Sequence, residues 1–230
     1  MSSIQLVLNE SYYLKDPQHT DLGQRIISVS IKIIDELGFE QFTFKKLATE
    51  IGSTEASIYR YFDNKHRLLT YLVAWYWSWM EYQIEFQTHY IQDPHKKLKR
   101  IISLLTQNIQ QDHSFAHIDE IVLNRIVIAE SDKTYLTKNV DTDNKDGLFR
   151  GYKSLCERIA QTIIEINNDY PYPYSLVSTI LEASHQQIFF SNHLPSLSNL
   201  KREDENRNNA LKDFLESLVF GTVSNYSTTD

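Results

Sequence analysis

One stretch near the N-terminus, Phe42 to Lys65, constrains the fold of this chain more than any other. Its sequence, FTFKKLATEIGSTEASIYRYFDNK, contains two short runs whose apolar residues recur three or four positions apart. Thr43 and Thr54 precede these runs and belong to the residue types preferred as helix N-caps. Gly52 stands between the runs, where a left-handed residue ends a helix with least strain. The stretch therefore predicts two short helices joined by a tight turn.

An amphipathic helix is predicted just before this pair. It begins after Thr20 or Asp21 as the cap, carries an apolar stripe, and ends at Gly38. Three helices that share one core form a helix-turn-helix head, in which the second helix of the pair lies in the major groove of DNA. The residues expected to form this core are Ile26, Ile33, Leu37, Phe42, Leu47, Ile51, Ile58 and Phe62.

Composition favours an all-α protein, and its charge argues against non-specific coating of nucleic acid while leaving room for DNA binding by one segment. The 230 residues are 41% hydrophobic and include only 6 glycines and 5 prolines, which suits long helices. A net charge of −7 argues against coating nucleic acid, but residues 20–70 are neutral, with seven Lys or Arg against seven Asp or Glu. The single cysteine, Cys156, and a start without a signal-peptide pattern indicate the cytoplasm.

The run from Ile26 to Leu69 resembles the N-terminal domain of the TetR family of bacterial transcriptional regulators. The specific part of the resemblance is the spacing from Gly52 through Tyr59 and Phe62 to Lys65. It implies a homodimer with an all-helical ligand-binding and dimerisation domain, which represses at a palindromic operator and is released by a small molecule. It also implies that Tyr59, Tyr61 and Lys65 contact the DNA backbone, and that Lys45, Glu55, Ala56 and Ser57 face the groove.

The chemistry of these side chains supports such roles. A tyrosine hydroxyl donates to a phosphate, a lysine supplies a mobile cation, and Thr54 and Ser57 add neutral phosphate contacts. Lys45 and Arg60 suit guanine acceptors, Glu55 suits the cytosine amino group, and Ala56 suits a thymine methyl. The predicted DNA-binding residues are Lys45, Thr54, Glu55, Ala56, Ser57, Tyr59, Arg60, Tyr61 and Lys65.

Two of these residues, Glu55 and Tyr61, have a purely structural alternative, and a third position, Phe44, departs from the family. Glu55 lies in the first turn of its helix, where the helix dipole favours a carboxylate whatever it touches. Tyr61 can instead pack against the first helix. Phe44 stands where the family often carries a small polar residue that touches phosphate, so that contact is expected to be missing.

After Asn64 as cap, a long helix is predicted from Lys65 to about Tyr90, and it contains the aromatic run YLVAWYWSWMEYQIEF. Glu81 and Glu85 interrupt the run before it is long enough to span a membrane. Its aromatic side chains form either ordinary core or the wall of a ligand pocket. The predicted ligand-binding residues are Trp75, Trp79, Tyr82, Phe86 and Arg125, although Arg125 also suits an ordinary ion pair.

Further helices are predicted from Pro94, over Ala116 to Glu130 and over Leu148 to Ile166, with residues 131–146 as a loop. The last two, Leu176 to Leu194 and Glu203 to Val219, suit a four-helix dimer interface. The predicted domains are an N-terminal arm (1–19), a helix-turn-helix domain (20–66) and a helical ligand-binding and dimerisation domain (67–230).

Two other classes of protein compete with this interpretation. A metal-dependent helical-bundle enzyme would use a Glu-x-x-His pair, but that chemistry needs the pair twice, and only Glu182 with His185 is present. A helical adaptor would leave the pattern from Gly52 to Lys65 unexplained. The sequence therefore predicts no catalytic residue, no metal site and no cofactor.

Overall fold

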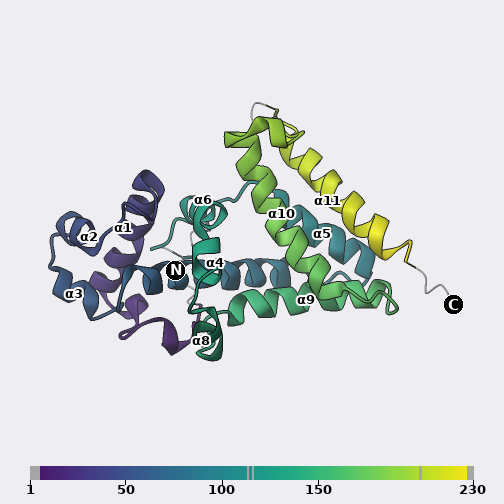
Figure 1. Cartoon of the computed structure of the whole chain (residues 1–230). Coiled ribbons are helices and arrows are strands. Elements are labelled where there is room, and N and C mark those ends of the chain that lie inside the picture. The colour runs from purple at the N-terminus through teal and green to yellow at the C-terminus, as the bar shows by residue number, and fades with distance from the viewer. Residues whose placement is uncertain (1–5, 113, 116, 202–203, 227–230) are drawn as a thin grey trace. The chain divides into compact units, whose positions relative to one another are not determined.

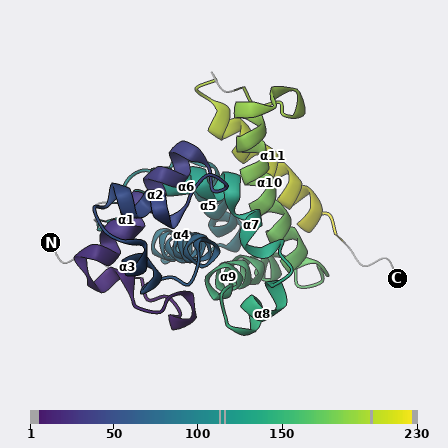
Figure 2. The same cartoon turned by 60° about the vertical axis from the view of Figure 1, so that its left-hand side comes forward.

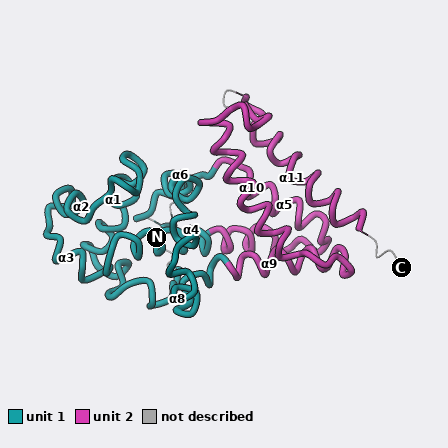
Figure 3. The backbone as a smooth tube through the Cα atoms, in the orientation of Figure 1, with its two compact units in different colours: residues 1–79, 109–152 teal, residues 80–108, 153–230 magenta. Residues whose placement is uncertain are grey.

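The computed structural model describes residues 6–112, 114–115, 117–201 and 204–226, and its regular elements in these ranges are all helices (Figure 1). The chain divides into two compact units, one of residues 1–79 with 109–152 and one of residues 80–108 with 153–230 (Figure 3). We call them unit 1 and unit 2. Within the described ranges, none of the helices combines the length and apolar character that crossing a bilayer requires. The division into domains at residue 66 stays a prediction.

Unit 1 contains the predicted head. Figures 1 and 2 show its first three helices gathered near the start of α4, which continues into unit 2. Thr20 caps α1 by accepting a hydrogen bond from the Gly23 amide, and Gly38, at φ 77°, ends it. The helices of unit 1 are α1 (Asp21–Leu37), α2 (Phe44–Glu50), α3 (Glu55–Tyr59), the first part of α4 (Lys65–Thr88), α6 (Glu120–Glu130), α7 (Asp132–Tyr135) and α8 (Val140–Lys145).

The core of the head forms largely as the apolar spacing predicts. Ile26, Ile58 and Phe62 are fully buried, so α1 and α3 close over one interior. Leu37 is a correction to the expected core, because it is 48% exposed. It is the last residue of α1, and its side chain lies beside an open surface pocket that residues of α1 and α2 line, so solvent reaches it.

Residues 6–19 of the predicted N-terminal arm lie against the rest of unit 1. They form two short 3-10 turns, η1 (Glu10–Tyr12) and η2 (Pro17–His19), capped by Asn9 and Asp16. Leu8, Tyr12 and Pro17 are buried in unit 1. The arm is therefore part of the core of unit 1 rather than a loose tail.

The segment predicted as a loop, residues 131–146, was wrongly assigned, since it folds into α7 and α8. Two polar side chains hold it: Thr134 and Asp143 are buried, and buried polar groups require partners that a free loop does not provide. The helix before it begins at Glu120 after Asp119 as cap. The predicted start at Ala116 lies outside the described residues.

Unit 2 holds a bundle of longer helices, in which α11 packs against both α5 and α10 (Figure 1). Pro94 opens α5 behind the Asp93 cap, as the sequence predicts, and Leu98, Ile101 and Ile102 are buried. The predicted start of the last helix at Glu203 lies outside the described residues. The helices are the end of α4, α5 (Pro94–Thr106), α9 (Arg150–Ile166), which starts in unit 1, α10 (Pro173–His193) and α11 (Arg207–Val223), with the 3-10 turn η3 (Pro195–Leu197).

Candidate nucleic-acid interface

The turn between α2 and α3 is built by local hydrogen bonds, as the capping residues predict. The Thr43 hydroxyl accepts from the Lys46 amide, and the Thr54 hydroxyl accepts from the Ser57 amide. Between them, Gly52 has φ 60°, and the Ser53 amide donates to the Ala48 carbonyl at 2.9 Å. A side chain at φ 60° is strained, so glycine suits this turn best.

The outer face of α3 is short, polar and accessible. Its buried anchor is Ile58, while Glu55, Ala56 and Arg60 are exposed. Ser57 is half-buried, and its hydroxyl lies 2.9 Å from that of Thr54. The helix therefore offers a carboxylate, a methyl and a guanidinium on one surface, the groups that distinguish base edges in a major groove.

Tyr59 is held in place by an aromatic neighbour. It is 48% exposed, and its ring meets the edge of Phe44 at a centroid distance of 5.1 Å. Phe44 is buried and packs in turn against Phe42 at 6.3 Å. Phe44 thus supports the exposed tyrosine, a role that the sequence interpretation missed.

Tyr61 lies differently from the prediction. It is only 3% exposed, and its hydroxyl is 2.7 Å from the hydroxyl of Thr20 at the start of α1. This pair joins the turn after α3 to α1, which is the structural alternative stated from the sequence. In this conformation Tyr61 does not present its hydroxyl to DNA.

The Lys65 ammonium is bound to the loop between α1 and α2. It donates to the carbonyl oxygens of Phe39, Glu40 and Phe42 at 3.0, 3.1 and 3.2 Å, and it lies 4.7 Å from the centre of the Phe39 ring. An ammonium has three donors, so a phosphate contact requires exchanging one of these bonds. Lys45, by contrast, is exposed on α2.

Salt bridges connect the head to α6 and α7 within unit 1. Arg125 forms a bidentate pair with Asp35 of α1, at 2.9 and 2.6 Å. Glu130 accepts from the Phe39 amide at 3.0 Å, and Lys133 bridges Glu130 and Glu40 at 2.6 and 3.0 Å. The hydrogen bond to Asp35 raises the pKa of Arg125 above its usual value.

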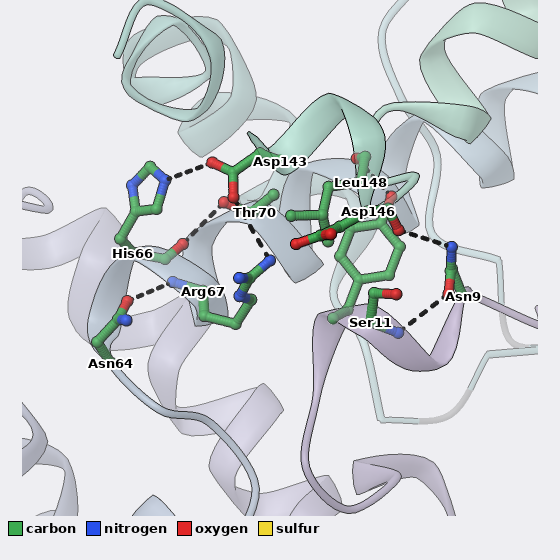
Figure 4. Close-up of polar contacts among 10 residues, drawn as sticks. Asn9, Ser11, Asn64, His66, Arg67, Thr70, Asp143, Asp146 and Leu148 are labelled. Atoms are coloured by element: carbon green, nitrogen blue, oxygen red, sulfur yellow. Dashed lines mark hydrogen bonds and ion pairs between the residues drawn. The ribbon is translucent and has the colours of Figure 1, made fainter. Parts of the chain in front are cut away.

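A further polar contact, at the start of α4, escaped the sequence interpretation. Asp143 of α8 faces His66 at 3.8 Å and Arg67 at 3.7 Å (Figure 4). Its carboxylate is nearly buried and lies against the first turn of a helix, where negative charge is favoured. No spacing rule relates Asp143 to His66, so the sequence offered no signal for it.

The predicted ligand-binding residues are distributed over both units. Trp75 and Trp79 are buried in unit 1, and the edge of Trp75 meets Phe115 at 5.3 Å. In unit 2, Tyr82 is half-buried and Phe86 is 69% exposed. Arg125 is engaged by Asp35. The assignment of these residues to an effector stays a prediction.

Glu120 is the most perturbed acid among the described residues. Its side chain is completely buried, and burial raises its pKa to about 7. The amide of Asp112 donates to one carboxylate oxygen at 3.2 Å, which partly offsets the burial. Across the described part of the chain, no group of three or more His, Cys, Asp or Glu side chains is arranged to hold a metal.

Comparisons with known proteins agree with this geometry. Residues 26–72 match the family model described as bacterial regulatory proteins, tetR family. A curated relative, the nucleoid occlusion factor SlmA of Mannheimia succiniciproducens, is 29% identical over 90 residues. That match covers 37% of this chain and 42% of the relative, so the similarity spans less than half of the relative's length. The resemblance to the TetR family stated from the sequence is confirmed.

Solved structures extend the similarity along the chain. A TetR-family transcriptional regulator from Syntrophomonas wolfei has a TM-score of 0.61 at 14% identity, covering 90% of this chain and 97% of its own. AibR, solved in complex with isovaleryl coenzyme A and operator DNA, has a TM-score of 0.58 at 13% identity, covering 86% and 99%. At such identities the structures establish a shared fold, which confirms the predicted all-α architecture of a small N-terminal head and a larger helical domain.

Proposed function

We propose that this chain, which carries the N-terminal segment of the bacterial regulatory proteins of the tetR family, is a ligand-responsive, DNA-binding transcriptional regulator. The observation that carries the proposal is α3: a helix anchored by Ile58 inside a closed head, with Glu55, Ala56, Tyr59 and Arg60 outside. We assign it no catalytic step. Repression, rather than activation, follows the family resemblance, and such a protein works in the cytoplasm beside the chromosome.

The DNA contacts divide into two groups in this proposal. Tyr59 and Thr54 contact phosphates and set the register, and Lys65 joins them by exchanging a carbonyl for a phosphate oxygen. Lys45, Glu55, Ala56, Ser57 and Arg60 face base edges. Tyr61 keeps α1 and α3 together through Thr20, which supports the readout without a direct contact.

A homodimer is required for useful affinity. The head is electrically neutral between residues 20 and 70, and a single short helix reads few base pairs, so two heads at a palindromic site supply the missing contacts. We propose that α10 and α11 form the interface. Phe214 on α11 is 49% exposed, and Phe189 and Phe190 on α10 are half-buried, which leaves apolar surface for a partner.

The regulatory step we propose is a shift between two dimer states. AibR, whose fold this chain shares, was solved with a coenzyme A thioester and with operator DNA. By analogy, a small molecule bound beside the aromatic residues of α4 favours the state whose recognition helices no longer match the operator. A preference of about 2.7 kcal/mol changes the ratio of the two states about 100-fold.

The test is selection of bound fragments from genomic DNA at stated salt concentrations, with Tyr59→Phe as the variant. This substitution keeps the ring contact with Phe44 and removes one hydroxyl. We expect a palindromic motif from the wild type and at least tenfold weaker binding by the variant, because hydrogen bonds to charged groups contribute roughly 1.5–3 kcal/mol.

Tyr90→Phe is the matched control, since Tyr90 is 89% exposed in unit 2 and lies outside the proposed interface with DNA. It should bind as the wild type does. Failure of the wild type to enrich any sequence at any salt concentration, after removal of co-purified ligand, would overturn the proposed function and reopen the adaptor class.

A further inference from the structure

Residues 8–19 of the N-terminal arm contact several elements of unit 1. At one end, the Asn9 side chain donates to the carbonyl of Asp146 (Figure 4). The Tyr12 hydroxyl donates to the carbonyl of Leu148. Gly147 lies between these acceptors at φ 79°, and a Cβ there would come within 2.6 Å of the Asn9 side chain. The arm is thus anchored firmly to the turn between α8 and α9.

The middle of the arm is packed against α1 and α4. Tyr12 and Tyr13 meet the buried Tyr71 ring edge-on at 6.4 and 6.2 Å. The turn at Pro17 approaches α1 so closely that a Cβ on Gly23 would lie 2.3 Å from the Pro17 carbonyl oxygen. This close approach requires glycine, so the path of the arm is determined by packing on both sides.

Between Tyr13 and Pro17 the arm meets the turn that follows α3. The Leu14 amide donates to the Tyr61 carbonyl at 2.8 Å, and the next residue, Lys15, places its ammonium 5.3 Å from the centre of the Tyr61 ring. Lys15 is exposed, and in the described residues it forms no ion pair. Its neighbour Asp16 accepts from the Gln18 amide and the Tyr13 hydroxyl and faces His19 at 3.3 Å, rather than pairing with Lys15.

We propose that Lys15 is a DNA-contacting residue that binds a backbone phosphate beside the α3 surface. The inference rests on the proposed function and extends it to the arm. Tyr61 has its hydroxyl engaged by Thr20, so the cation held over its ring supplies the phosphate contact at this point of the surface. An ammonium attracts phosphate without base preference, so Lys15 contributes affinity and register rather than specificity.

The experiment measures operator affinity of the full-length protein over a salt series, using the motif selected by the wild type. Each phosphate neutralised contributes about 0.9 to the slope of log K against log salt. Lys15→Gln should therefore flatten the slope by about 1.8 for a dimer with two arms, and weaken binding several-fold at low salt. Lys15→Arg should retain the slope, because it keeps the charge.

Lys138→Gln is the matched control, as an exposed lysine of unit 1 between α7 and α8. A second variant, Gly23→Ala, tests the packing of the arm against α1, because the added methyl group would collide with the Pro17 backbone. In a double-mutant cycle, the effect of Lys15→Gln should shrink in the Gly23→Ala background, since a displaced arm no longer positions the cation.

The outcomes separate this inference from the proposed function. If the wild type binds its motif and Lys15→Gln has the same salt slope as the wild type, the inference is wrong and the proposed function stands. If Lys138→Gln flattens the slope as much as Lys15→Gln, the effect is general charge and the inference is again wrong. If the wild type binds no DNA, the proposed function fails and the inference with it.

Discussion

The head and the α10–α11 pair differ in how completely they bury their apolar residues. In the head, Ile26, Ile58 and Phe62 are fully buried, and α3 exposes short or polar side chains around the supported Tyr59. The α10–α11 region leaves Leu194, Leu197 and Phe214 between 46% and 58% exposed. The head completes its own core within one chain, whereas the last two helices retain apolar surface that a second chain can cover.

This difference explains why the structure of the head can be predicted from a sequence motif more fully than that of α10 and α11. A self-contained head of short helices depends on caps and glycines at fixed spacing, since two-turn helices are marginal without them. Long helices in a bundle need only an apolar stripe in order to pack, and the stripe alone does not predict which partner helix covers it.

The largest expected effect is on the closed core. Phe62→Ala should destabilise unit 1 by about 3–5 kcal/mol, because it removes a fully buried ring and leaves a cavity. Urea unfolding at fixed protein concentration measures the loss. Phe86→Ala is the control, since that ring is 69% exposed, and it should change stability by less than about 0.5 kcal/mol. Equal losses of stability in Phe62→Ala and Phe86→Ala would contradict the conclusion that the head has a closed core of its own.

Glu120 is the exception inside unit 1, because it buries an acid. Its pKa is raised from 4.5 to about 7 in the folded protein, so the native state holds its proton more tightly than the unfolded chain. The stabilising effect is complete below about pH 4.5 and is lost as the pH rises through about 7. Glu120→Gln should remove this loss. Above about pH 7, the free energy of unfolding of the variant should exceed that of the wild type by up to roughly 3 kcal/mol.

Urea unfolding of both proteins at about pH 5 and about pH 8 checks this sign. The two stabilities should lie closer together at the lower pH. A wild type that gains stability relative to Glu120→Gln on going to the higher pH would show that Glu120 is ionised and well solvated in the fold.

A smaller effect is expected at the uncovered helices. Phe214→Ser should weaken the proposed dimer about tenfold or more, since complete burial of such a ring contributes roughly 1.5–3 kcal/mol. Sedimentation equilibrium measures the dissociation constant. Tyr172→Ser, on a side chain 61% exposed before α10, is the control and should leave the dimer unchanged. An unaffected dimer in Phe214→Ser would place the interface elsewhere.

The smallest effect is expected at the Arg125–Asp35 pair, which lies on the surface of unit 1. Arg125→Ala should cost only about 0.2–1 kcal/mol, because exposed pairs are screened by solvent. A double-mutant cycle with Asp35→Ala isolates the coupling between the two residues. A coupling above about 2 kcal/mol would mean that the head depends on α6 and is not self-contained.

Local signals predicted most of the head. Thr20, Thr43 and Thr54 cap the helices as expected, and Gly38 and Gly52 adopt the left-handed backbone expected at helix ends. Each signal depends on residues within one helical turn, which is why the sequence suffices. The short helices α7 and α8 were missed because a buried Asp143 and Thr134, rather than an apolar stripe, hold that segment.

The sequence by itself determined the helices of the head, the position of its tight turn and the family that the head resembles, because caps and apolar spacing act within a few residues. Only the tertiary structure decided what each polar side chain touches. It engaged Tyr61 with Thr20, Lys65 with three carbonyls and Arg125 with Asp35, and it brought Lys15 over Tyr61. These contacts join residues 23 to 90 positions apart, and their geometry exists only after the helices pack.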